Sequence, residues 1–368
     1  MSFLTAIGLM SGTSLDGVDV ALIETDGERI KRQGPVGYRP YSPQEQSLLR
    51  RALGEGAALT DRTARPGVLA EAEALVTRAH AEAVEDFVAK NKIEKSKVAI
   101  VGFHGQTVLH RPKARLTIQI GDGKALARRL KLPVAYDFRA ADVAAGGEGA
   151  PFAPVYHRAL VENLDVRKPA AVINIGGVAN ITLINGECDP IAFDTGPGNA
   201  PIDDLVRART GIAHDLDGKL AAKGRVDETI VPRVLADPFF ALQPPKSLDR
   251  AAFASLPLAS LSIEDAAATA TATIAASIAR ALDHLPAKPA TIVIVGGGAH
   301  NATLMSMLRE RLGATVLRGS DVGWSADAIE AQAFAYLAVR TLKGLPLTFP
   351  ATTGVPRAMT GGVVAKPE

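Results

Sequence analysis

One arrangement occurs twice in this chain of 368 residues, and it constrains the fold more than any other feature. An apolar strand enters a glycine turn, a second strand follows, an Asp-Gly or Asn-Gly pair turns the chain, and a third strand comes next. The first copy begins at Ile7 and the second at Ala170, and helices alternate with strands after both. This order predicts two similar α/β domains, each with a mixed sheet flanked by helices. One large α/β domain with coincidental hairpins is the alternative.

Hydrophobic periodicity predicts the individual elements. The expected strands are Ile7–Leu9, Val18–Thr25, Arg29–Tyr38, Val98–Phe103, Leu116–Ile120, Pro133–Tyr136, Ala170–Ile175, Ala179–Ile184, Pro190–Phe193, Thr291–Val295 and Ala314–Leu317. The expected helices are Val68–Phe87, Gly123–Leu130, Pro201–Arg209, Glu264–Leu285, Asn301–Leu312 and Asp327–Leu342. Ser262 and Asp265 have capping-box spacing at the start of one helix, and Asp327 and Glu330 have it at another.

Composition excludes several classes of protein. Hydrophobic residues are 47% and charged residues 22%, which predicts a sizeable core. The net charge of +2 predicts neither nucleic-acid binding nor a polybasic membrane anchor. No apolar stretch is long enough to span a bilayer, and no basic region precedes an apolar run at the N-terminus, so we expect no signal peptide. The single cysteine, Cys188, excludes an internal disulfide framework and fits a reducing cytoplasm.

Three glycine turns favour phosphate or nucleotide binding. The first is GLMSGTSLDGVD at 8–19, whose backbone N–H groups and hydroxyls can contact phosphate oxygens while Asp16 and Asp19 can reach a Mg²⁺. The second is NIGGVAN at 174–180, and the third is GGGAHN at 296–301, which can admit the flat face or sugar of a nucleotide. Ordinary glycine hairpins and a tight strand-to-helix turn remain the alternatives.

Polar residues after strands are candidates for catalysis and ligand contact. Asp194, in DTGPGN at 194–199, follows an apolar strand, so its carboxylate can deprotonate a water or hydroxyl, or it can cap the next helix. His104 and the YDFR segment at 136–139 also follow strands; a core histidine and an Asp137–Arg139 ion pair are the alternatives. Glu330 can face a sugar or cap a helix. The chain has no G-x-x-x-x-G-K-[ST], G-x-S-x-G or H-E-x-x-H, so the remaining chemistry favours phosphoryl transfer.

Together these motifs resemble the actin/hexokinase/Hsp70 ATPase superfamily, with duplicated ribonuclease-H-like domains and an active site in the cleft between them. Within it the chain resembles the anhydro-N-acetylmuramic acid kinase family over nearly its whole length. The strings that carry the resemblance are GLMSGTSLDGVD at 8–19, GFHGQT at 102–107, YDFR at 136–139, GGEGAPFAP at 146–154, NIGGVANIT at 174–182, FDTGPGN at 193–199, GGGAHN at 296–301 and GWSADAIEAQAFA at 323–335.

The resemblance implies a cytoplasmic, homodimeric enzyme of cell-wall recycling that uses ATP, Mg²⁺ and water to open 1,6-anhydro-N-acetylmuramic acid and phosphorylate its 6-oxygen. Asp194 is then the general base, and Asp16 is the residue that binds Mg²⁺. The residues implied to bind ATP or its phosphates are Gly12, Thr13, Ser14, Leu15, Asp16, Gly17, Val18, Asp19, Gly176, Gly177, Gly196, Gly296, Gly297 and Gly298. Those implied to bind the sugar are His104, Asp137, Arg139, Asn199 and Glu330.

The expected lobes are 1–139 with 343–368, and 140–342. Ala140–Pro154 is the best candidate hinge, and Pro238–Pro257 an irregular segment suited to a loop or lid. Two other functions stay open at this point. One is a kinase for a different sugar or carboxylate, which needs no hydrolytic water. The other is a nucleotide switch without a small-molecule substrate, which typically carries additional domains.

Overall fold

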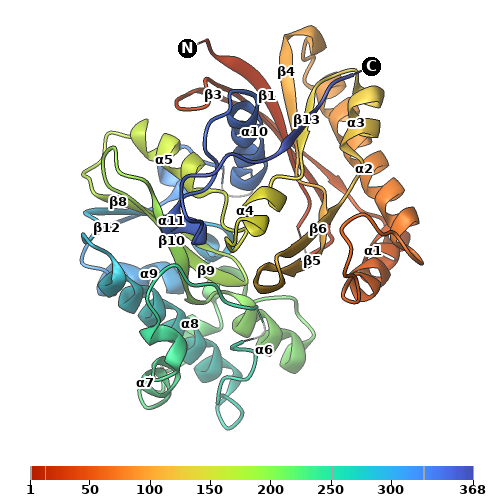
Figure 1. Cartoon of the computed structure of the whole chain (residues 1–368). Coiled ribbons are helices and arrows are strands. Elements are labelled where there is room, and N and C mark those ends of the chain that lie inside the picture. The colour runs from red at the N-terminus through yellow and green to blue at the C-terminus, as the bar shows by residue number, and fades with distance from the viewer. Residues whose placement is uncertain (1, 13, 251, 326–327, 368) are drawn as a thin grey trace. The chain divides into compact units, whose positions relative to one another are not determined.

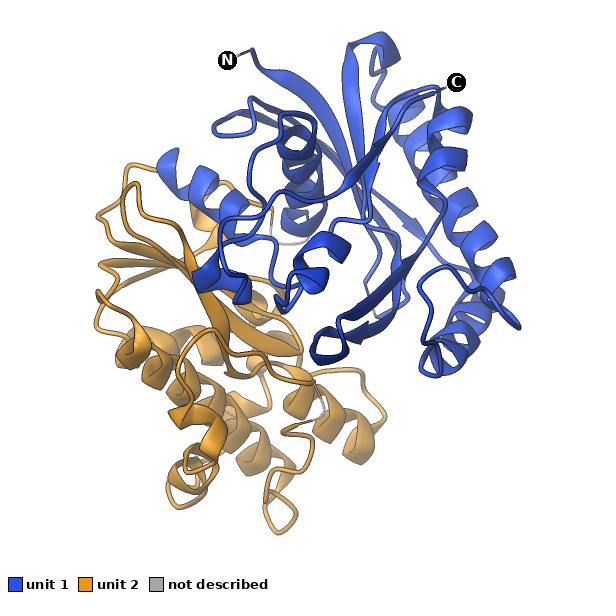
Figure 2. Ribbon diagram, in the orientation of Figure 1, with its two compact units in different colours: residues 1–163, 328–368 blue, residues 164–327 orange. Residues whose placement is uncertain are grey.

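The computed structural model describes residues 2–12, 14–250, 252–325 and 328–367. It divides the chain into two compact units, residues 1–163 with 328–368 (unit 1) and residues 164–327 (unit 2), coloured separately in Figure 2. Unit 1 is therefore built from both ends of the chain, whereas unit 2 is one continuous segment. Each unit is described by itself below.

Unit 1 combines a mixed sheet with a separate hairpin, β5–β6, and several helices (Figure 1). Its strands are β1 (Leu4–Met10), β2 (Gly17–Thr25), β3 (Ile30–Pro40), β4 (Val98–Phe103), β5 (Gln106–Arg111), β6 (Leu116–Ile120), β7 (Val134–Tyr136) and β13 (Val363–Ala365). Its helices are α1 (Pro43–Gly56), α2 (Leu69–Lys90), α3 (Gly123–Leu130), α4 (Ala140–Ala144), α5 (Pro154–Glu162), α10 (Ile329–Leu342) and α11 (Pro350–Thr353), with short 3-10 helices at Lys95–Lys97 and Pro112–Ala114.

Unit 2 has a smaller mixed sheet with helices packed against it. Its strands are β8 (Ala170–Ile175), β9 (Val178–Ile184), β10 (Ile191–Pro197), β11 (Thr291–Val295) and β12 (Thr315–Arg318). Its helices are α6 (Ala200–Thr210), α7 (Ile230–Leu235), α8 (Ile263–Ala281) and α9 (Ala302–Arg311). Its 3-10 helices are η3 (Leu216–Gly218), η4 (Ala221–Lys223), η5 (Pro238–Ala241), η6 (Leu282–His284), η7 (Gly297–His300) and η8 (Gly319–Val322).

The two main sheets have the same topology. In unit 1 the order is β13-β7-β4-β1-β2-β3, and in unit 2 it is β10-β9-β8-β11-β12. The first three strands of each unit are antiparallel neighbours, and the fourth and fifth run parallel to the first. Among the described strands of these two sheets, only β13 has no counterpart. The predicted duplication of an α/β unit is thereby confirmed, as is the mixed character of both sheets.

Most predicted elements lie where hydrophobic periodicity places them. The predicted bounds of Val98–Phe103, Leu116–Ile120, Ala170–Ile175 and Thr291–Val295 are those observed. The Ser262 hydroxyl accepts a hydrogen bond from the Asp265 amide at 3.0 Å, so the predicted cap of α8 is confirmed. Asp327, predicted to cap the last long helix, lies outside the described residues, and Ala328 occupies the N-cap position of α10.

The sheet of unit 1 is covered on both faces. Alternate residues of a strand point to opposite faces, and in β1 Ile7 and Leu9 join the apolar cluster that includes α2. Gly8, between them, lies against α10: a Cβ added there would be 1.9 Å from the Ala331 carbonyl oxygen. Gly102 in β4 shows the same close approach, 2.1 Å from the Phe334 oxygen. Glycine therefore lets α10 pack directly on the backbone of the sheet.

This packing explains where the units divide. Residues 140–163 and 328–342 belong to unit 1, whereas we expected them in the second lobe. Helix α10 packs on β1, β2 and β4, and α5 packs on α10. The Ala140–Pro154 segment, expected to be a hinge, lies inside unit 1, and the chain enters unit 2 only after Asn163.

Substituting Gly8 tests the close approach of α10. We expect Gly8→Ala to lower the free energy of unfolding by about 3 kcal/mol, the upper end of the usual cost of overpacking, because the obstructing atoms are backbone. Gly54→Ala is the matched control: this position in α1 has no heavy atom within 4 Å of an added Cβ, so alanine should be neutral or stabilise by about 0.5–1 kcal/mol. Denaturant unfolding measures both. Equal stability of the two variants would contradict the packing argument.

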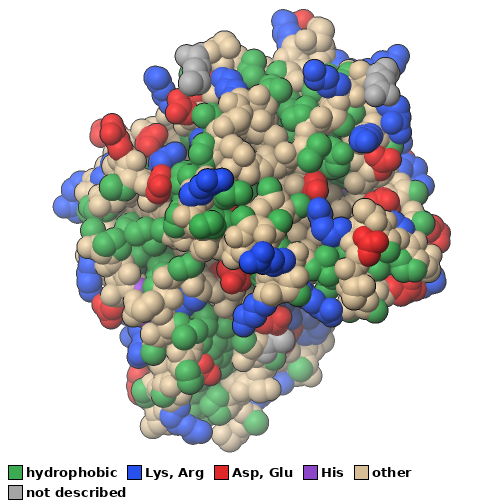
Figure 3. Space-filling model, in the orientation of Figure 1, with side chains coloured by type: hydrophobic (Ala, Val, Ile, Leu, Met, Phe, Trp, Pro, Cys, Tyr) green, Lys and Arg blue, Asp and Glu red, His purple; other side chains and the backbone are tan. Residues whose placement is uncertain are grey.

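The surface carries both signs of charge. Figure 3 shows basic and acidic side chains interspersed over one face, in agreement with the net charge of +2. Within the described ranges, no helix combines the length and the apolar character that crossing a membrane requires.

Candidate active site

The predicted phosphate loop of unit 1 joins β1 to β2. Ser14 and Asp16 are exposed in this loop, and the Ser14 hydroxyl donates to the Asp16 carboxylate at 2.9 Å. Leu15 has a positive φ of 58° and a buried side chain, so the turn projects its polar neighbours toward solvent. Thr13, also predicted to contact phosphate, lies outside the described residues. The loop thus presents a hydroxyl and a carboxylate on a tight backbone turn.

The remaining residues predicted for this loop belong to β2. Gly17 and Val18 are buried, and Val18 is part of the core of unit 1. Asp19 is half-buried and pairs with Met10 in the β1–β2 ladder. A Cβ on Gly17 would lie 2.5 Å from the Arg39 carbonyl oxygen, so close strand packing accounts for that glycine. Exposed polar groups are therefore concentrated before Gly17.

A buried network fixes the start of the loop. The Ser11 hydroxyl donates to Gln106 Oε1 at 2.7 Å and lies 3.1 Å from the Tyr41 hydroxyl. Gln106 Nε2 donates to the Gly12 carbonyl oxygen at 3.2 Å. Gln106 is two residues beyond His104, so one short segment of the GFHGQT motif reaches the phosphate loop. We did not predict a role for Gln106.

His104 and Arg139, both predicted to bind the sugar, contact each other. Arg139 Nη2 lies 3.1 Å from His104 Nε2, and His104 Nδ1 lies 3.0 Å from the Gly105 carbonyl oxygen. Arginine can only donate, so we assign Nε2 as the acceptor and Nδ1 as the protonated nitrogen. Burial, followed by the charge of Arg139, holds the pKa of His104 well below its ordinary value. A neutral imidazole therefore orients the guanidinium.

Arg139 has hydrogen-bond partners but no ion pair among the described residues. Its Nη1 donates to the Gly149 carbonyl oxygen at 2.7 Å, and its guanidinium lies 5.6 Å from the centre of the Phe152 ring. Its Nε is buried without a partner. Burial lowers the pKa of Arg139, although the nearby charges of Glu330 and Asp142 raise it. A half-buried cation with an unused donor is suited to an anionic ligand.

Asp142 fixes the loop whose Gly149 carbonyl oxygen accepts the hydrogen bond from Arg139. Its carboxylate is buried and accepts from the Gly149 amide and from the Thr353 hydroxyl, both at 2.7 Å. The glycine-rich segment after α4 is thus fixed by one side chain at its base. Asp142 is a second contributor that we did not predict.

Asp137 and Glu330 lie nearby in unit 1 but do not bond to Arg139. The Asp137 carboxylate pairs with Arg62 at 2.6 Å, so the alternative of an Asp137–Arg139 ion pair is wrong. Asp137 has a positive φ of 55°, unusual for a residue with a side chain. Glu330 lies in the first turn of α10 with its side chain exposed.

In unit 2 the predicted glycine turns meet at one end of the sheet. Strands β8 and β11 are parallel neighbours, so the turn at Gly176 and Gly177 and the turn at 296–298 follow adjacent strand ends. Asn199 joins them: its amide N–H donates to the Gly176 carbonyl oxygen at 2.7 Å, and its Nδ2 donates to that of Ile175 at 3.3 Å. A Cβ on Gly297 would be 3.3 Å from Asn199 Nδ2. Several predicted residues are therefore brought together here.

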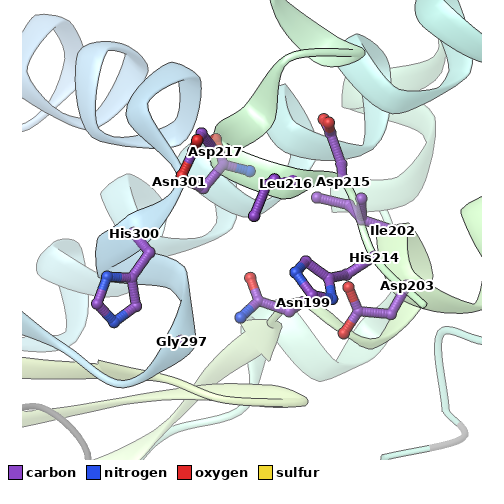
Figure 4. Close-up of a pocket in the computed structure, with 10 residues that line it drawn as sticks. All are labelled: Asn199, Ile202, Asp203, His214, Asp215, Leu216, Asp217, Gly297, His300 and Asn301. Atoms are coloured by element: carbon purple, nitrogen blue, oxygen red, sulfur yellow. The ribbon is translucent and has the colours of Figure 1, made fainter. Parts of the chain in front are cut away.

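Beside this junction is a cavity of about 500 Å³. Figure 4 shows the amide of Asn199 near the turn at Gly297, with Asp203 and His214 on one side and His300 on the other. Leu216 contributes an exposed apolar side chain, and Asp217 a carboxylate on a backbone with a φ of 58°. Burial raises the pKa of Asp203, opposed first by the charge of His214. The cavity therefore offers both apolar contacts and hydrogen-bond acceptors.

Asp194 lies within an edge strand and not after it. We expected the strand to end at Phe193, but β10 continues through Pro197. The pairing of β10 with β9 shifts register between Asp194 and Gly196, and such a bulge redirects side chains. Asp194 Oδ2 accepts from the Leu248 amide at 2.7 Å, and Asp194 has no ion pair among the described residues. The half-buried carboxylate thus keeps an oxygen for another partner.

Burial changes the acidity of Asp194. It raises the pKa of Asp194 to about 6, although the hydrogen bond from Leu248 lowers it. This shift favours base chemistry, because a pKa nearer neutrality gives a stronger base that is still largely ionised at pH 7.

Gly196, predicted to contact phosphate, is explained by packing. It has a φ of 151°, and an added Cβ would lie 2.9 Å from Ser277 in α8 and 3.0 Å from Phe240. The residue is buried, and it lets the bulged strand approach α8 closely. The glycine-rich appearance of DTGPGN therefore has a structural cause at this position.

A family model and named relatives match this chain over nearly its whole length. A family model described as anhydro-N-acetylmuramic acid kinase matches residues 4–367. A protein of that name from Bradyrhizobium diazoefficiens is 61% identical over 365 residues, covering 99% of this chain and 100% of the relative. One from Methylobacterium nodulans is 53% identical over 374 residues, with the same coverage. A solved xylulose kinase from Lactobacillus acidophilus has a TM-score of 0.48 at 10% identity and covers 100% of this chain and 94% of its own.

Proposed function

Because the chain belongs to the anhydro-N-acetylmuramic acid kinase family and is a sugar kinase, we propose that it converts 1,6-anhydro-N-acetylmuramic acid, ATP and water to N-acetylmuramic acid 6-phosphate and ADP. The family supports the substrate. The observation that carries the hydrolytic step is the half-buried Asp194 carboxylate, which accepts one backbone hydrogen bond and has no ion pair among the described residues.

Asp194 is the general base of this proposal. It takes a proton from the water whose oxygen attacks the anomeric carbon, and the bond from that carbon to the 6-oxygen breaks. The freed 6-oxygen attacks the γ-phosphorus, and the bond to the ADP oxygen breaks. The proton on Asp194 leaves to solvent. The raised pKa of Asp194, about 6, supports this role because the carboxylate is ionised at neutral pH yet basic enough to accept a proton.

Unit 1 supplies the groups for phosphate and sugar in this proposal. The loop from Gly12 to Asp16 offers backbone N–H groups and the Ser14 hydroxyl to the ATP phosphates. Arg139, oriented by His104, binds the lactyl carboxylate, and its unpartnered Nε and lack of an ion pair among the described residues support this. Glu330 and Asp137 are proposed as further sugar contacts. In unit 2, the glycines at 176, 177 and 296–298, with Asn199, are proposed to contact the ATP phosphates from a second loop cluster.

The cavity of unit 2 is the proposed nucleoside site. Leu216 and Ile202 offer apolar surface to a base, and Asp217 and Asp203 can accept hydrogen bonds from ribose hydroxyls. The adjacent turn at Gly297 leaves the backbone open to a phosphate-bearing ligand. The volume of about 500 Å³ falls in the range typical of small-molecule sites.

Mg²⁺ fits the residues of the phosphate loop. Mg²⁺ is usually held by one or two carboxylates together with substrate phosphates and water. Asp16 offers one exposed carboxylate, and no larger cluster of ligating side chains occurs among the residues that the structure describes. Asp16 would hold Mg²⁺, which when bound neutralises charge on the phosphates. A role in peptidoglycan recycling in the cytoplasm, as a homodimer, completes the proposal and rests on the family alone.

Labelled water tests the proposed reaction. In H₂¹⁸O we expect ¹⁸O at the anomeric oxygen of the product and none on the 6-oxygen or the phosphoryl group, because water attacks carbon and not phosphorus. Mass spectrometry of early time points measures it. Unlabelled product incubated in H₂¹⁸O is the control for spontaneous anomeric exchange. Two results would indicate a kinase that phosphorylates a free hydroxyl. One is that ¹⁸O enters the product no faster than in this control. The other is that ordinary hexoses stimulate ADP release as strongly as the anhydro sugar does.

A further inference from the structure

Lys246 is buried where a lysine is costly. It lies between η5 and α8, and its neighbours Pro245 and Ser247 are both exposed. No carboxylate forms an ion pair with its ammonium among the described residues. Burial, together with the charge of Arg280, lowers the pKa of Lys246. Burying a lysine without an ion pair costs free energy of desolvation, so the position of Lys246 suggests a specific role.

The ammonium is held by one carbonyl and an aromatic cluster. Nζ donates to the Phe239 carbonyl oxygen at 3.1 Å and lies 4.6 Å from the centre of the Phe239 ring and 5.8 Å from that of Phe193. Phe239 packs in turn on Phe240 and Phe253. Because Phe239 lies in η5, the lysine side chain fastens the segment 244–248 to a buried part of unit 2.

The backbone of the same segment holds Asp194. The Asp194 amide donates to the Lys246 carbonyl oxygen at 3.0 Å, and two residues later the Leu248 amide donates to Asp194 Oδ2 at 2.7 Å. The segment therefore binds both the main chain and the carboxylate of Asp194. Strand β10 is at the edge of its sheet, so this segment occupies the side that no strand covers.

We infer that Lys246 is a positioning residue: its buried ammonium fastens the segment whose Leu248 amide orients the Asp194 carboxylate. This inference rests on the proposed role of Asp194 as the base. Lys246 acts through position and not through charge, because its ammonium donates to the Phe239 carbonyl oxygen and forms no ion pair with Asp194.

Lys246→Met tests the inference. Methionine fills similar space against the phenylalanine rings, and the Phe239 carbonyl keeps its second donor, the Leu242 amide at 3.2 Å. Removing a buried charge in this way is often neutral or stabilising. We expect an unchanged or higher melting temperature, a kcat lower by about 10- to 100-fold, and KM values for ATP and the anhydro sugar within about twofold. Lower stability with normal kcat would overturn the inference.

Leu248→Pro removes the amide donor directly and provides a double-mutant cycle. We expect the single variants to lower kcat similarly and the double variant to lower it no further, because both act on one hydrogen bond. Multiplicative losses would show that Lys246 acts elsewhere and overturn the inference. Leu308→Ala, in the buried face of α9, is the control for general loosening of the core and should lower the melting temperature without this kcat loss.

Asp194→Asn separates the inference from the proposed function. If that variant retains normal turnover, the base assignment fails, and the inference fails with it. If Asp194→Asn is impaired while Lys246→Met and Leu248→Pro are both fully active, only the inference fails.

Discussion

Asp194→Asn is expected to bind both substrates normally and to lose at least about 10²-fold in turnover, the scale of a lost general base. In the unmodified protein the Leu248 N–H lies 2.7 Å from the Asp194 carboxylate. The side-chain oxygen of the new asparagine can accept the same hydrogen bond, so we expect the strand geometry to be kept. The amide cannot accept a proton from water at neutral pH. Steady-state kinetics, with calorimetric titration of ATP and the anhydro sugar, separates binding from chemistry.

The pH dependence of kcat gives a second test of Asp194 as the base. Burial raises the pKa of Asp194 to about 6, and the base must be ionised, so kcat of the unmodified enzyme should fall as the pH drops through about 6. In Asp194→Asn that acid limb should vanish from the residual activity. Near-normal turnover, or an acid limb that survives the substitution, would assign the base to another group.

Arg139→Met is expected to weaken binding of the anhydro sugar by about 10- to 150-fold, the range for a hydrogen bond to a charged group, with a smaller effect on ATP. The guanidinium of Arg139 has an unpartnered Nε and lacks an ion pair among the described residues. Arg139→Lys keeps a charge but not the planar fork, and should be intermediate. KM for the sugar and isothermal titration measure the loss.

A sugar without the lactyl ether makes the test of Arg139 specific. The unmodified enzyme should bind this analogue as weakly as Arg139→Met binds the full substrate, and the variant should lose nothing further with it. Additive losses would place the lactyl carboxylate elsewhere. Melting temperatures control for the lost hydrogen bonds to Gly149 and His104.

The sequence predicts local structure well because its signals are local. Apolar runs that end in glycine turns mark the strands of both sheets, and the Ser262 hydroxyl caps α8 as its spacing predicts. Helix α1 is missed even though Ser42 and Glu45 form a full capping box at its start. This capping box is a local signal, so the sequence alone is sufficient to predict the start of α1.

The parts of the site that escape prediction depend on contacts between distant residues. Gln106 reaches Ser11 across 95 positions, and Asp142 reaches Thr353 across 211. Lys246 gives no local sign that it is buried, because its exposed neighbours resemble an ordinary loop. The bulge in β10 likewise depends on pairing with β9. Motifs predict which residues meet a ligand, whereas the residues that position them are found only once the chain is folded.

The close packing of α10 on Gly8 also bears on the order of assembly during synthesis. The first strand, β1, is synthesised more than 300 residues before its covering helix, α10, so one face of that sheet has no covering helix until α10 is made. Residues 164–327 form a continuous unit that needs no such late partner. Nascent chains of this protein thus carry an unfinished first domain while a complete second one is already available to fold.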